Sequence, residues 1–96
     1  MFKVVGKTLD GRLVVSGVYR FYETHGMPLD VVFQILQDKQ MLPCWISFHR
    51  EAMAAGMQHD RLIAKLDPAL SDSYGSGFRD YVVRGLERLR EAGILK

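Results

Sequence analysis

The fold of this chain is decided by residues 28–40, whose sequence is PLDVVFQILQDKQ. Apolar residues recur there at the i, i+3, i+4 and i+7 positions that line one face of an α-helix: Leu29, Val32, Phe33 and Leu36. Pro28 suits the first turn, where a missing N–H costs no hydrogen bond. Val31 and Ile35 widen the apolar face, which predicts a helix covered on two sides. We therefore expect a central helix over residues 28–40.

A second helix is predicted over residues 43–55, directly after the first. Pro43 again suits a first turn, and Gly56 is a suitable stop. Trp45, Phe48 and Ala52 line one face of this helix. The short link Met41-Leu42 between the two helices permits either an ordinary helical hairpin or a helix-turn-helix.

The segments before the central helix predict a hairpin and a short helix. Asp10-Gly11 separates two runs rich in valine, and this pair is a strong signal for a β-hairpin over residues 2–16. Residues 17–25 have helical spacing, and Gly26 followed by Pro28 is typical of a helix end. Their aromatic and β-branched content leaves a strand open as the alternative.

Two further helical regions follow the central pair. Residues 59–74 are interrupted at Asp67-Pro68, which indicates either two short helices or one kinked helix. The last helix is expected over residues 76–92, with an apolar stripe that consists of Phe78, Tyr81, Val82, Gly85, Leu86 and Leu89. On its other side, Asp80 and Arg84 have the spacing of an ion pair.

These segments together predict a mainly α fold, a small bundle of about five short helices with an N-terminal β-hairpin. The 96 residues fit one domain over residues 1–96, in which 1–16 form the hairpin and 17–96 the helical bundle. Thirteen basic and eleven acidic residues are interspersed, which is typical of a solvated surface. A lone cysteine, Cys44, and the lack of a signal or membrane-spanning run favour a cytoplasmic protein.

The sequence offers no pattern typical of catalysis or metal binding. Gly6-Lys7-Thr8 resembles the end of a phosphate-binding loop, but the required earlier glycine and strand have no room before it. His25, His49 and His59 do not have the spacing of metal ligands, since no two of them are four residues apart. We therefore expect them at the surface or the core boundary. We therefore expect no enzyme, no cofactor and no metal site.

Protein binding is the favoured function. Cys44-Trp45-Ile46 places three apolar residues in succession, and one helix face cannot bury all of them. Together with Val31 and Ile35, they suggest an apolar surface that another protein, or a second copy in a homodimer, could cover. The residues predicted to contact the partner are Tyr19, Tyr22, Trp45 and Arg50, because aromatic and arginine side chains are enriched at protein contacts.

A DNA-binding regulator of the helix-turn-helix type is the alternative. The second helix would then read bases, and the contacts would come from His49, Arg50, Arg61 and Lys65. The near-balanced charge permits nucleic-acid binding without favouring it. The apolar start of the second helix also argues against it, since residues that read bases cluster near that end.

Overall fold

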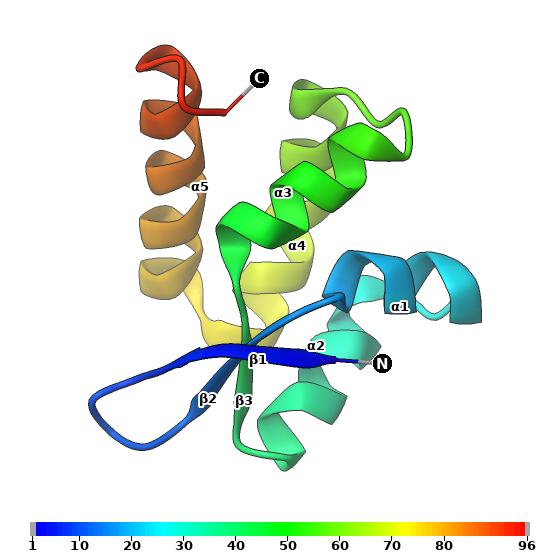
Figure 1. Ribbon diagram of the computed structural model, residues 1–96, viewed down its shortest axis with the longest axis vertical. Helices are drawn as coiled ribbons and strands as arrows, with labels where there is room; N and C mark the ends of the chain where they lie inside the picture. The colour runs from blue at the N-terminus through cyan, green and yellow to red at the C-terminus, as the bar shows by residue number, and fades with distance from the viewer. Residues whose placement is uncertain (1, 96) are drawn as a thin grey trace.

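The computed structural model describes residues 2–95 and has five helices and three short strands (Figure 1). In chain order the elements are β1 (Lys3–Lys7), β2 (Leu13–Ser16), α1 (Val18–His25), α2 (Leu29–Asp38), β3 (Met41–Pro43), α3 (Trp45–Ala54), α4 (His59–Tyr74) and α5 (Ser76–Glu91). The prediction of a mainly helical fold with an N-terminal hairpin is confirmed. The helical residues 18–25 also confirm the choice of a helix over a strand for that segment.

The hairpin is joined by a third strand that the sequence analysis did not predict. β1 pairs antiparallel with β2, and the loop between them is closed by a 2.8 Å hydrogen bond from Thr8 N to Arg12 O. β2 also pairs in parallel with β3, so the sheet order is β1-β2-β3. Helices α1 and α2 form the crossover that a parallel pair requires. The helical bundle expected over residues 17–96 therefore also contains one short strand.

The third strand begins where α2 ends. Gln40 takes a φ of 59°, which turns the chain back toward β2. Backbone bonds from Leu13 N to Gln40 O and from Cys44 N to Val15 O then fix β3 beside β2. Pro43, expected in the first turn of a helix, instead ends β3, where an edge strand tolerates its missing N–H. The segment Met41–Pro43 is consequently a strand, and no helix-turn-helix links α2 to α3.

The core lies between the sheet and the helices, and α2 is central to it. Val32, Phe33 and Leu36 are fully buried, as the i, i+3, i+4 pattern predicts. They pack in one cluster with buried residues of the other elements, among them Val15, Phe48, Leu62 and Leu66. Figure 1 shows α3, α4 and α5 on one side of the strands, with α1 beside them.

Helix α1 is held to α3 by a carboxylate. Gly17, with a φ of 89°, precedes the helix and has no side chain that could cap it. Instead Glu51 of α3 accepts a 2.9 Å hydrogen bond from Gly17 N and a 3.3 Å bond from Arg20 N. A negative charge at a helix N-terminus also interacts favourably with the helix dipole.

Helix α4 runs without a break through Asp67-Pro68, which decides between the two alternatives in favour of one helix. The Asp67 carboxylate caps no new helix there. It accepts hydrogen bonds from the Arg79 guanidinium of α5, and this contact holds the pKa of Asp67 below its usual value. Arg79 also binds Asp80, so the expected pair of Asp80 with Arg84 does not form. None of the described helices combines the length and apolar character needed to cross a membrane.

Candidate functional site: an apolar groove along the last helix

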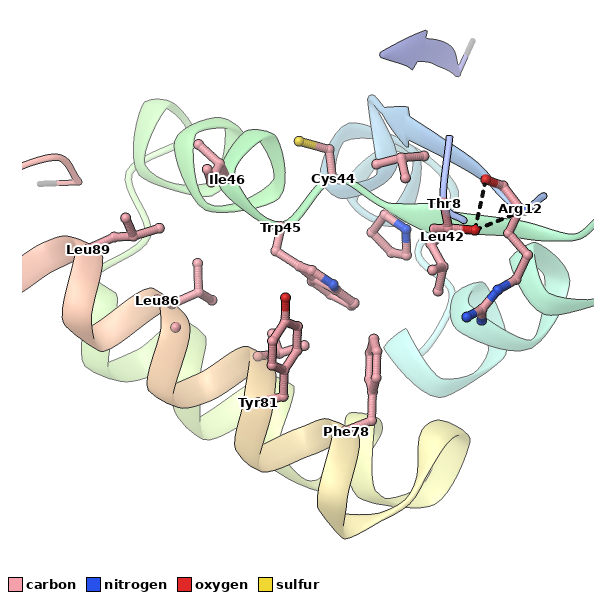
Figure 2. Close-up of a pocket in the computed structure, with 14 residues that line it drawn as sticks. Thr8, Arg12, Leu42, Cys44, Trp45, Ile46, Phe78, Tyr81, Leu86 and Leu89 are labelled. Carbon is pink, nitrogen blue, oxygen red and sulfur yellow. Dashed lines mark hydrogen bonds between the residues drawn. The ribbon is translucent and has the colours of Figure 1, made fainter. Parts of the chain in front are cut away.

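A groove of about 530 Å³ lies between α5, the start of α3 and the strands (Figure 2). One wall is the stripe of α5, and Trp45 and Ile46 of α3 stand opposite it. The hairpin loop closes one end of the groove through Thr8 and Arg12. The volume lies within the range of small-molecule ligand sites.

The α5 wall is formed by an apolar stripe of which only the inner part is covered. Val82 and Leu86 are buried against the bundle, whereas the Tyr81 side chain is 73% exposed. Gly85 lines the groove and leaves a hollow there, in which an added Cβ atom would meet nothing within 4 Å. A stripe with a buried half and an open half is the arrangement that a partner segment can complete.

Trp45 connects the groove to the aromatic core. Its ring lies 5.6 Å from Phe33 and 6.1 Å from Phe78, measured between ring centroids. Tyr74 packs behind it, 6.5 Å away, and its buried hydroxyl has no hydrogen-bond partner among the described residues. This burial raises the pKa of Tyr74 from its ordinary value of 10.0 to about 12. Trp45 is half-buried and therefore serves both the core and the groove.

The charged groups at the hairpin end of the groove neutralise each other. The Arg12 Nε donates to the Asp10 carboxylate at 3.1 Å, and the Thr8 hydroxyl donates to the same carboxylate. These bonds hold the pKa of Asp10 below its usual value. The groove is therefore apolar along its length, and the polar groups at its hairpin end are hydrogen-bonded to one another.

The residues predicted to bind a protein are not brought together in one place. Trp45 lines the groove. Arg50 is exposed one turn after Ile46 on α3, in a second hollow formed with Ile94 and Leu95. Tyr22 lies in a third hollow, beside Leu29 and Lys65.

Tyr19 is only 3% exposed, which corrects its prediction as a contact residue. Its ring packs edge-on against Phe48, with centroids 5.3 Å apart, and it belongs to the core. The expected apolar surface is corrected as well. Val31 is 42% exposed and Ile35 is half-buried, but neither lines the groove that Trp45 borders.

Two of the three histidines are buried, contrary to the expectation of surface or boundary positions. His49 of α3 and His59 of α4 are 0% and 6% exposed. Their Nε2 and Nδ1 atoms lie 2.9 Å apart and share a hydrogen bond. Burial lowers the pKa of His49, and the charges of His59 and Arg90 lower it further. The hydrogen bond therefore joins α3 to α4, and burial favours the neutral form of His49.

The residues of the DNA-binding alternative are also separated. His49 is buried in the core, where it cannot reach a base. Arg61 and Lys65 lie exposed on α4, and Lys65 borders the hollow that also contains Asp30 and Asp72. Arg50 lines a different hollow. No described feature favours this alternative.

Phe78, Tyr81, Gly85 and Leu89 line the groove but were not among the predicted contact residues. Their stripe was predicted as apolar, and the available signal within it was a tyrosine four residues before a glycine. Among residues 2–95, no group of three or more His, Cys, Asp or Glu side chains could hold a metal ion.

The fold and the groove define a small helical domain with a three-stranded sheet and an open apolar surface. In the comparisons with known proteins, no family model, no curated protein and no solved structure matches this chain.

Proposed function

We propose that this protein is a non-enzymatic binding module whose groove receives an amphipathic helix from another protein. The observation that carries the proposal is the uncovered half of the α5 stripe, with Tyr81 exposed beside the hollow at Gly85. An apolar stripe of this kind is ordinarily covered by the core. Where part of it stays exposed, a partner can remove that apolar area from water.

The dimensions of the groove support a helical occupant. Phe78 and Leu89 mark its two ends on α5 and are eleven residues apart, which corresponds to about 16 Å, or three helical turns. Residues spaced i, i+3 or i+4 and i+7 on a partner helix would meet the stripe at matching intervals. Aromatic side chains such as Trp45 and Tyr81 are also the types that contribute most to binding energy at interfaces.

Gly85→Leu tests the proposal without removing any existing contact. The new side chain should fill the hollow, and the helix should tolerate it because glycine is the less favourable helix residue by about 1 kcal/mol. We expect a displayed library of helical peptides of about 16 residues to yield binders of the wild-type protein that Gly85→Leu no longer binds. Enriched sequences should share an i, i+3 or i+4, i+7 apolar stripe.

Gly77→Leu is the matched control. Gly77 is exposed on the same helix, also has open space around it, and does not line the groove. This variant should bind the selected peptides as the wild-type protein does. Binders that ignore Gly85→Leu, or a library that yields no binder, would show that the groove is not the binding site. Binding by small apolar compounds alone would assign the groove to a different class of ligand.

A further inference from the structure

We propose that the partner helix carries acidic residues along the edge that faces Arg84 and Arg88 of α5. This inference rests on the proposed function and adds the charge of the partner. Arg84 and Arg88 follow Tyr81 at i+3 and i+7, which places them beside Tyr81 on the exposed margin of the stripe. A helix seated in the groove would therefore have one edge within reach of both guanidinium groups.

Arg84 and Arg88 form no ion pair with any acidic group of the described residues. Within residues 2–95, the ion pairs are those of Arg12 with Asp10 and of Arg79 with Asp67 and Asp80. Glu87 and Glu91 follow Arg84 and Arg88 at i+3, on the side farther from Tyr81, and form no ion pair with them. The margin of the groove on α5 is thus cationic and unpaired.

None of the described residues that line the groove is acidic. Arg50, one turn beyond Ile46 on α3, lies in the separate hollow beside Ile94 and Leu95 and does not line the groove. The nearest acidic group on the hairpin, Asp10, is already engaged by Arg12 and Thr8. Complementary charge at the rim of an apolar site selects partners and accelerates their association. The unpaired arginines of α5 and the lack of an acidic lining residue therefore favour a partner segment with flanking carboxylates.

The same charges disfavour a second copy of this chain as the occupant. A two-fold contact places the same surface on both sides, so a dimer formed through this face would contain the unpaired arginines of both copies. The chain also carries a net charge of +2. An acidic segment of a different protein meets the groove without this repulsion.

Two synthetic helical peptides with one apolar stripe, flanked by Glu in one and by Lys in the other, test the inference. Trp45 is the only tryptophan in the chain and borders the groove, so its fluorescence reports binding directly. At low salt we expect the acidic peptide to bind about tenfold more tightly. The Arg84→Glu/Arg88→Glu variant should reverse this preference, and added salt should shrink the difference.

Arg61→Glu/Lys65→Glu is the matched control, since it makes the same change of charge at an exposed i, i+4 pair on α4, away from the groove. It should leave the acidic preference in place. Equal binding of both peptides, or an equal effect of the control, would overturn the charge inference. The proposed function would still stand if Gly85→Leu abolished binding of both.

Failure of the proposed function has a different signature. In that case neither peptide changes the Trp45 signal, and Gly85→Leu has no effect on any library binder. Light scattering tests the remaining possible occupant of the groove, a second copy of this chain. A dimer that dissociates in Gly85→Leu but not in Gly77→Leu would assign the groove to a second copy and would contradict the inference.

Discussion

Phe33→Ala is expected to lower the free energy of unfolding by about 3–5 kcal/mol, a large share of the stability of a domain this size. Phe33 is fully buried in α2, and its ring meets Trp45, Phe48 and Tyr74 at centroid distances of 5.6, 6.3 and 5.8 Å. Truncation would remove apolar burial and leave a cavity among aromatic rings that cannot close it. Denaturant unfolding followed by circular dichroism measures the loss.

Val31→Ala is the control on the same helix. Val31 is 42% exposed, so its truncation should cost less than about 1 kcal/mol. If Phe33→Ala cost no more than Val31→Ala, the placement of α2 at the centre of the core would be wrong. Phe33→Ala is also expected to change the shape of the groove at Trp45, because the Phe33 ring packs against the Trp45 ring.

Acidification is expected to destabilise the protein through the buried histidine pair. The pKa of His49 is lowered in the folded state, first by burial and then by His59 and Arg90. The unfolded chain therefore binds more protons than the folded one once the pH falls below the ordinary histidine value of 6.5. Stability from this source is fully present above that pH and is lost as the pH falls through the folded pKa.

The slope of this loss is limited to about 1.4 kcal/mol per pH unit for one proton. The His49→Leu/His59→Leu variant should have a flatter stability profile between neutral and mildly acidic pH, because replacing both partners leaves no unpaired polar atom. His25→Gln is the control, since His25 lies exposed at the end of α1. An unchanged slope in the double variant would remove the pair as the cause.

The local patterns predicted the helices and the hairpin well. The i, i+3, i+4 spacing at Leu29, Val32 and Phe33 corresponds to buried positions, because one face of α2 is packed against the core. Gly26 takes a φ of 63° and ends α1, as its position after His25 predicted. These features depend on residues that are close together in the chain.

The features that were missed depend on contacts between distant residues. β3 has three residues and ends in Pro43, and its pairing with β2 cannot be inferred from so short a run. His49 and His59 are ten residues apart on different helices, so only the packing of α3 on α4 brings them together. Trp45 was identified from its apolar neighbours, but the groove it borders depends on where α5 packs.

The most direct test of the groove as the binding surface is to map amide chemical shifts while the acidic peptide is added. The account predicts that the perturbed amides cluster at Trp45, Ile46 and the α5 stripe from Phe78 to Leu89, and that Gly85→Leu abolishes these changes. Perturbations centred on Val31 and Ile35, or on the hollow beside Tyr22, would contradict it.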